Sequence, residues 1–336
     1  MLADLVAARE LPESPQPVGG TWRRAPSGVP ASYATSLPFG IASAARRDPG
    51  AIAAALADRF SALPWVRAAK PSGGGHLTVT VTAQALASVA PRMAAAGASC
   101  ARSVILRGTQ ATVLPWPDPA GARTWRQAWD GQAAAMTGRC ARAAGAAIAH
   151  GTERALPAAS GHDPALSPVA AAVAYFGADV VRYRLARTLP GRVGALGREA
   201  ADVADYLAPV QLAHAEAASA LRWAAELGLQ ARAGNELAQA LDSRKEQGLL
   251  GLLSFLPVRV AAAARTGRAA ELPRYLEHVA QTWTDWRLAR PALPFGGAAV
   301  PNDPEVIGAR LVLTEAARWV LAAGLALTGI AASDRI

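Results

Sequence analysis

The segment Ala309–Ile336 of this 336-residue chain reads ARLVLTEAARWVLAAGLALTGIAASDRI. Apolar residues recur in it at steps of three and four, which is the spacing of one buried helix face: Leu313, Ala316, Val320, Ala323 and Leu327. Arg310, Thr314 and Arg318 fall on the opposite side. The pattern predicts a long packed helix that closes a helical domain.

The residues before this helix have helical spacing as well. The apolar positions predict successive helices over roughly 169–188, 197–230, 233–245, 247–265, 271–290 and 304–328. Helices of such lengths joined by short connections form all-α bundles. The preceding stretch 151–168 has the composition of a linker, since Pro, Gly, Ser and Ala dominate it.

The N-terminal third has a mixed pattern. A helix is expected over Leu2–Ala8, followed by a loop over the Pro- and Gly-rich segment Pro12–Pro30. Asp48-Pro49 is typical of a helix start, and His76–Thr82 alternates as a strand does. These features predict a small α+β module.

The secondary structure of the middle of the chain is predicted from shorter sequence patterns. Strands are expected over 103–106 and 111–114, then a turn over 115–121 and an Ala-rich helix to about residue 149. The fold class predicted is mainly α, in three parts: a small N-terminal α+β domain over 1–100, a connector over 101–168 and a C-terminal all-α helical bundle over 169–336.

Charge and composition limit the classes of partner that the protein could bind. The chain has 34 basic and 25 acidic residues, a net charge of +9, which suits a polyanion such as nucleic acid. Two cysteines without paired spacing argue against a disulfide framework and a zinc site, so the cytoplasm is expected. The five histidines lack metal-ligand spacing.

The longest uncharged apolar run, Trp319–Ala332, is too short for a bilayer, so a soluble protein without a membrane partner is expected.

The helical half resembles the anticodon-binding part of arginyl-tRNA synthetases. Gly177–Tyr183 resembles the Asp-Ala-Leu-Arg-Tyr signature that names the DALR anticodon-binding domain, and Gln211–Glu216 resembles the family's Gln-Tyr-Ala-His-Ala-Arg. Two positions depart from the family: Leu212 replaces an aromatic residue that can stack on a base, and Glu216 replaces an arginine, which puts acidic charge near phosphate.

The N-terminal third resembles the additional domain of the same family. The resemblance lies in Ala31–Ser36, Asp48-Pro49 and Pro71–Leu77, and in the family this domain touches the outer corner of tRNA at the D-loop. The resemblance implies tRNA as the partner, with tRNA-Arg the candidate that the family suggests. The tRNA-binding candidates are Tyr33, Arg182, Gln211, His214, Arg310 and Arg318.

Several of these residues also have a purely structural interpretation. His214 can support helix packing instead of contacting a base, and Arg182 can anchor a hydrogen bond between helices. Tryptophans on bundle helices can stack on nucleotides but are more often core; Trp283, Trp286 and Trp319 are of this kind.

The signatures of amino-acid activation are missing. Pro117–Gly121 resembles the turn that precedes the His-x-Gly-His motif of class I synthetases, but Thr124–Gln127 stands in place of that motif. Neither Lys70 nor Lys245 lies in a Lys-Met-Ser-Lys-Ser context. Both motifs stabilise charge on the transferring phosphates, so no catalytic residues are predicted, and residues 101–168 resemble a degenerate remnant of the catalytic domain.

Three functions follow from the resemblance. The first is a non-catalytic relative of arginyl-tRNA synthetase that binds tRNA and needs no cofactor. The second is a protein–protein module that docks on a synthetase or another translation factor. The third is an arginine–tRNA ligase, as the family implies, which alone would use ATP.

Overall fold

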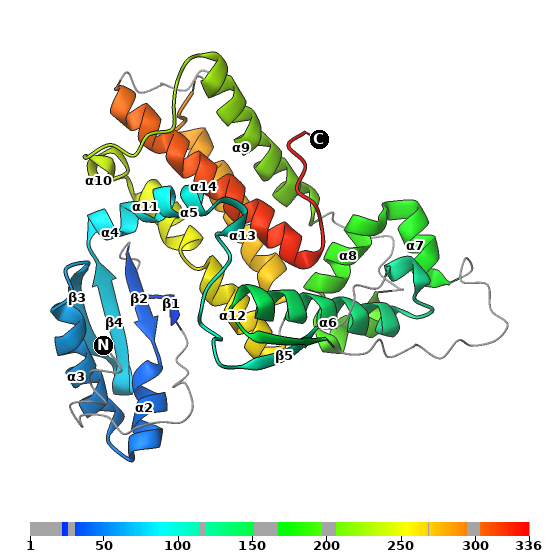
Figure 1. Ribbon diagram of the computed structural model, residues 1–336, viewed down its shortest axis with the longest axis horizontal. Helices are drawn as coiled ribbons and strands as arrows, with labels where there is room; N and C mark the ends of the chain where they lie inside the picture. The colour runs from blue at the N-terminus through cyan, green and yellow to red at the C-terminus, as the bar shows by residue number, and fades with distance from the viewer. Residues whose placement is uncertain are drawn as a thin grey trace. The chain divides into compact units, whose positions relative to one another are not determined.

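Figure 1 shows the computed structural model of the protein, which describes residues 22–25, 31–113, 118–150, 167–196, 206–267, 269–293 and 303–335. The predicted helix over 2–8, most of the loop over 12–30 and most of the linker over 151–168 lie outside these residues. The chain divides into two compact units, Met1–Val89 with Asn235–Gly251, and Ala90–Gly234 with Leu252–Ile336. The predicted fold class, mainly α with a small N-terminal α+β part, is confirmed.

The first unit is built on an antiparallel sheet with strand order β1-β2-β4-β3. The strands are β1 (Trp22–Arg24), β2 (Ser32–Thr35), β3 (Val66–Ser72) and β4 (His76–Val81). Tyr33 of β2 pairs with Val79 of β4, and Lys70 of β3 pairs with Thr78. The strand predicted over 76–82 is therefore present, and its register places Leu77 and Val79 in the core.

Helices α2 (Leu37–Ala45) and α3 (Pro49–Ser61) supply the rest of that core. The unit also contains α4 (Ala83–Ala87), α10 (Leu237–Ala240) and the start of α11 (Arg244–Leu253). The predicted helix start at Asp48-Pro49 is confirmed, because an Asp48 carboxylate oxygen accepts the Ala51 N–H at 2.8 Å. Ile52, Leu56 and Phe60 then fall on the buried face of α3.

The second unit contains a strand–helix–strand segment. Strands β5 (Gln110–Val113) and β6 (Ala147–His150) pair in parallel, and α6 (Trp125–Ala143) connects them. The prediction of an Ala-rich helix to residue 149 is wrong at its end, since the helix stops at Ala143 and Gly145 adopts a φ of 88°. The strand predicted over 103–106 is also wrong, because Ser103 and Leu106 donate their N–H groups to carbonyls at the end of α6 instead of to a strand.

A helical bundle makes up the rest of this unit. It contains α5 (Val89–Ala96), α7 (Pro168–Phe176), α8 (Ala178–Arg187), α9 (Ala208–Glu226), α12 (Leu256–Thr266), α13 (Glu271–Ala289) and α14 (Pro304–Thr328). The single helix predicted over 169–188 is two helices, because Gly177 breaks it with a φ of 88°. The helix predicted over 247–265 is likewise interrupted between Leu253 and Leu256.

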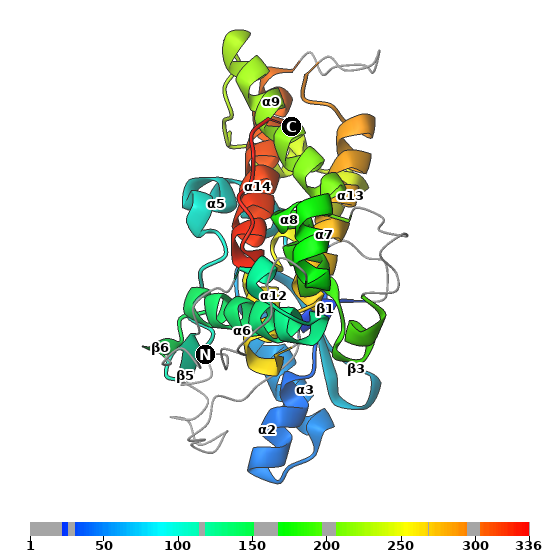
Figure 2. The same cartoon turned by 90° about the vertical axis from the view of Figure 1, so that its right-hand side faces the viewer.

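Helix α14 is the centre of the bundle. It packs along both α9 and α13 (Figure 2). The predicted apolar face is buried, and Arg310 and Thr314 on the other side are buried too, so the helix is enclosed on most sides. Arg244–Thr266 and Pro304–Thr328 are long and apolar enough to cross a membrane by length and composition, but 56% and 72% of their apolar stretches are buried inside the protein, as in core helices.

Candidate functional site

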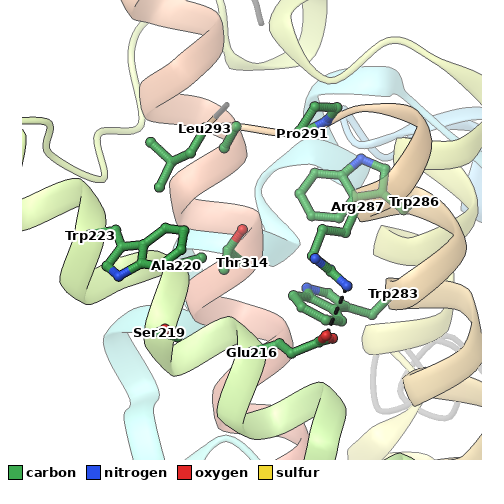
Figure 3. A pocket seen from close by; sticks show the side chains of 11 residues that line it. Glu216, Ser219, Ala220, Trp223, Trp283, Trp286, Arg287, Pro291, Leu293 and Thr314 are labelled. Carbon is green, nitrogen blue, oxygen red and sulfur yellow. Dashed lines mark hydrogen bonds and ion pairs between the residues drawn. The ribbon is translucent and has the colours of Figure 1, made fainter. Parts of the chain in front are cut away.

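A cavity of about 200 Å³ lies between α9, α13 and α14 (Figure 3). Its lining from α9 is spaced by three and four residues, so that the side chains share one helix face, and the same spacing holds on α13. The segment after α13 and one residue of α14 complete the walls. The lining residues are Glu216, Ser219, Ala220, Trp223, Trp283, Trp286, Arg287, Pro291, Ala292, Leu293 and Thr314.

An ion pair joins the two helices at this pocket. The Arg287 Nη2 donates to Glu216 Oε1 at 2.9 Å, and the two side chains are 16% and 30% exposed. The Arg287 guanidinium carbon also lies 5.2 Å from the centre of the Trp283 ring. The acidic residue that replaces the family's arginine is therefore balanced by a basic partner on α13, and the pocket carries both a hydrogen-bond acceptor and a donor.

Three tryptophans line the pocket in two different ways. Trp283 and Trp286 on α13 are buried, with 0% and 1% of their surface exposed, so their core interpretation is confirmed. Trp223 on α9 is 55% exposed and faces them from the opposite side of the pocket (Figure 3). Sequence reasoning missed Trp223, although it lies seven residues after Glu216 and so on the same face of α9.

None of the six predicted tRNA-binding residues lines this pocket. Arg310 is buried and donates from Nη1 to the Pro291 carbonyl at 3.1 Å, which holds the segment that forms one wall. Arg182 pairs with Asp179 at 3.0 Å on α8. Tyr33 lies on β2 in the other unit and is half-buried. Their roles in tRNA binding stay predictions.

The structure brings two of the predicted residues together with residues from the segment after α14. His214 and Arg318 lie near Asp334, with Arg222 of α9 beside them, and we call these four residues the tail cluster. Burial lowers the pKa of His214 below its ordinary value of 6.5, so the ring is neutral at pH 7. Gln211 lies about one turn before His214 on α9 and is half-buried.

The N-terminus of α6 contains Thr124–Gln127, the residues that stand in place of the nucleotide-binding His-x-Gly-His motif. We call this helix end the α6 corner. The Thr124 hydroxyl oxygen accepts the Gln127 N–H at 3.2 Å, and the Gln127 side-chain oxygen accepts the Arg123 N–H at 2.9 Å. The Thr124 bond is an N-cap, and the Gln127 side chain reaches back to Arg123, one residue further than in a capping box. A helix N-terminus binds phosphate through its free N–H groups, and the Thr124 cap already uses one of them, the Gln127 N–H.

Other chemically reactive groups are buried. Burial raises the pKa of both cysteine thiols, Cys100 and Cys140, to about 12, so neither forms a thiolate at neutral pH. Among the residues that the structure describes, no three His, Cys, Asp or Glu side chains gather as metal ligands would. The pocket and the tail cluster are thus the candidate sites in this part of the chain.

Comparison with known proteins identifies the region that contains the pocket and the tail cluster. Residues 210–336 match the family model of the DALR anticodon binding domain. The chain is 34% identical over 165 residues to an arginine–tRNA ligase of Renibacterium salmoninarum and 33% identical over 165 residues to one of Frankia alni. The chain is a distant relative of the arginyl-tRNA synthetases.

The matches cover 48% of this chain and 29% of each ligase, so the chain spans less than a third of these curated relatives. The solved arginyl-tRNA synthetase of Thermus thermophilus has a similar fold, with a TM-score of 0.60 at 16% identity over 100% of this chain and 98% of that one. All eleven lining residues of the pocket, and all four residues of the tail cluster, lie within the DALR domain.

Proposed function

We propose that the protein binds tRNA through its DALR domain and does not charge it. The observation that carries this proposal is the pocket between α9 and α13, which lies inside the domain and combines an exposed indole with a paired acceptor and donor. Single-stranded RNA loops are recognised by unstacked bases that stack on aromatic side chains and hydrogen-bond through their edges. The pocket offers both kinds of contact to one base.

Each lining group has a definite role in this proposal. The exposed Trp223 stacks on the base, because every base has a π-face that an indole can cover. The Glu216 carboxylate accepts a hydrogen bond from an exocyclic amino group, and Arg287 donates to a carbonyl or ring nitrogen. The net charge of +9 adds attraction to the phosphates, which weakens with salt.

The test is equilibrium binding of a tRNA-Arg transcript, with an unrelated structured RNA of equal length as control, at low and raised ionic strength. We expect tighter binding of the tRNA and a linear fall of log K with log salt. Equal affinity for both RNAs would reject the proposal.

The absence of charging is proposed from the corner at α6. Thr124 and Gln127 bond to the helix end, and neither can supply the imidazoles that the family's His-x-Gly-His motif contributes. The assay is ATP–pyrophosphate exchange with arginine. We expect no exchange above background, and measurable turnover would establish the ligase alternative.

A second function is favoured by one surface feature. Leu212 and Trp223 on α9 are 50% and 55% exposed, Leu227 at its C-cap is 63% exposed, and Leu288 on α13 is 53% exposed. Exposed apolar residues on neighbouring helices are typical of protein-binding surfaces. Docking on a synthetase would be indicated by a purified complex that persists after RNase treatment and is lost in Leu212→Asp.

A further inference from the structure

The segment after α14 folds back onto the bundle. Gly329, with a φ of 90°, ends the helix, and the Ile330 N–H bonds to the Leu325 carbonyl at 3.0 Å. This Schellman-type ending, with Ile330 buried, turns the chain back toward α9 (Figure 1). Ser333, Asp334 and Arg335 are exposed, so polar contacts hold this end of the segment in place.

These contacts surround Asp334 with donors. An Arg318 Nη2 lies 3.3 Å and 3.5 Å from the two carboxylate oxygens of Asp334, and Arg222 Nη2 donates to its backbone carbonyl at 3.2 Å. His214 Nδ1 lies 3.0 Å from the Ser333 carbonyl and therefore carries the proton. Its Nε2 is 3.9 Å from Asp334 and, in the neutral ring, adds no positive charge.

Asp334 fits this site loosely. Hydrogen bonds between a guanidinium and a carboxylate are ordinarily about 2.7–2.9 Å long, whereas both Arg318 contacts are longer than that. The Arg318 Nε is buried and has no hydrogen-bond partner, and the carboxylate itself is 51% exposed. Arg318 thus faces the Asp334 carboxylate, Arg222 bonds to the backbone carbonyl of the same residue, and donor capacity remains for an anion with more oxygens.

We propose that Arg222 and Arg318 form a binding site for one phosphate of the RNA backbone, and that Asp334 occupies this site in the free protein as a tethered competitor. The inference rests on the proposed function, because the phosphate belongs to the tRNA that the DALR domain binds. RNA binding then displaces the segment Ser333–Arg335 from α9, and the neutral His214 releases the Ser333 carbonyl without a change of charge.

The primary test compares Asp334→Asn with Asp130→Asn in anisotropy titrations of labelled tRNA-Arg transcript. Asp130 is a matched control, because it pairs with Arg126 on α6 and is 53% exposed. We expect Asp334→Asn to bind about two- to fivefold more tightly than the wild type, since exposed ion pairs contribute up to about a factor of five. Its salt slope should stay that of the wild type, because both proteins contact the same phosphate, whereas Arg318→Gln should lower the slope by about 0.7, the value for one phosphate on a single strand.

A double-mutant cycle assigns the effect to the arginine. Arg318→Gln should weaken binding, and adding Asp334→Asn to it should give no further gain. Hydrogen exchange of the wild-type protein should show faster exchange of residues 331–335 when tRNA is bound. This readout reports release of the segment whatever the size of the affinity change.

The outcomes separate the two proposals. If the wild type binds tRNA and Asp334→Asn matches Asp130→Asn, the phosphate site is overturned while tRNA binding stands. Slower exchange of residues 331–335 in the complex would also overturn it. If the wild type binds tRNA no better than unrelated RNA, both proposals fail together.

Discussion

The N-terminus of α6 and the pocket beside α9 use their polar groups in opposite ways. At α6, the Thr124 hydroxyl oxygen accepts the Gln127 N–H and the Gln127 side-chain oxygen accepts the Arg123 N–H, so both oxygens bond to the backbone at this helix end. In the pocket, Glu216 and Arg287 bond to each other beside a cavity of about 200 Å³. The two side-chain oxygens at the N-terminus of α6 are therefore used in internal contacts, whereas the polar pair in the DALR domain lies beside an open cavity.

The largest effect is expected from the buried wall of the pocket. Trp286→Ala removes a side chain that is 1% exposed, and the lost packing and the cavity should lower the free energy of unfolding by about 3–5 kcal/mol. Urea denaturation followed by circular dichroism measures the change. Trp223→Ala is the control, because the same truncation at a residue that is 55% exposed should cost far less stability. Equal losses of unfolding free energy in the two variants would show that the two sides of the pocket contribute equally to stability.

The next largest effect is expected on tRNA affinity, at a residue whose truncation should cost little stability. Trp223→Ala should weaken binding of tRNA-Arg about tenfold, because base–indole stacking contributes about 1–3 kcal/mol per base. Trp223→Phe should restore part of the affinity. Leu227→Ala is the matched control, since Leu227 is exposed at the C-cap of α9, four residues after Trp223, and does not line the pocket. If Leu227→Ala weakened binding as much, the exposed apolar face and not the pocket would be the contact surface.

Much of the helical fold could be predicted from the sequence, because helix packing leaves a local pattern of apolar residues. The C-terminal helix was predicted over 304–328 and occupies those residues. Strand β6 was missed because Ala147–His150 has the composition of the helix before it, and its pairing with β5 is a contact distant in sequence. The break at Gly177 was missed because the apolar spacing continues across it.

The candidate site was less predictable, for a physical reason. Glu216 and Arg287 are 71 residues apart, so their pairing depends on how α9 and α13 pack. The family resemblance drew attention to Glu216 as a departure but gave no sign of its partner. The pocket is a gap between helices, and no local spacing encodes its volume. His214 and Arg318 were selected as separate candidates, and their common contact with Asp334 appears only once the segment after α14 is placed.

A smaller effect on stability tests whether the N-terminus of α6 can bind a nucleotide. Thr124→Ala removes the N-cap hydroxyl and should lower the free energy of unfolding by about 1 kcal/mol. ATP should leave the melting temperature of the wild type and of this variant unchanged, because a ligand stabilises only the fold that binds it. Ser at the same position should restore stability. A clear ATP-dependent rise in the wild type would contradict the view that this corner takes no nucleotide.

The smallest effect concerns the other side of α9, where His214 faces the tail cluster instead of the pocket. Burial lowers its pKa, and Arg318 acts in the same direction, while the Ser333 carbonyl and Asp334 act against them. Because the folded pKa lies below the unfolded value of 6.5, the unfolded chain binds more protons in the window below that value. Stability should therefore be fully present above pH 6.5 and fall as the pH drops below it.

This dependence is measured by urea denaturation at pH values on both sides of 6.5, all kept above about pH 5, where carboxylates begin to titrate. His214→Gln should be less stable than the wild type at high pH, because it loses the ring packing, but its stability should change less between the two sides of the window. A variant as pH-dependent as the wild type would place the titrating group elsewhere. A wild type whose stability rises on acidification would reverse the sign and show that the Ser333 carbonyl and the Asp334 carboxylate together outweigh burial. The segment after α14 would then be held to α9 more firmly than the long Arg318 contacts indicate.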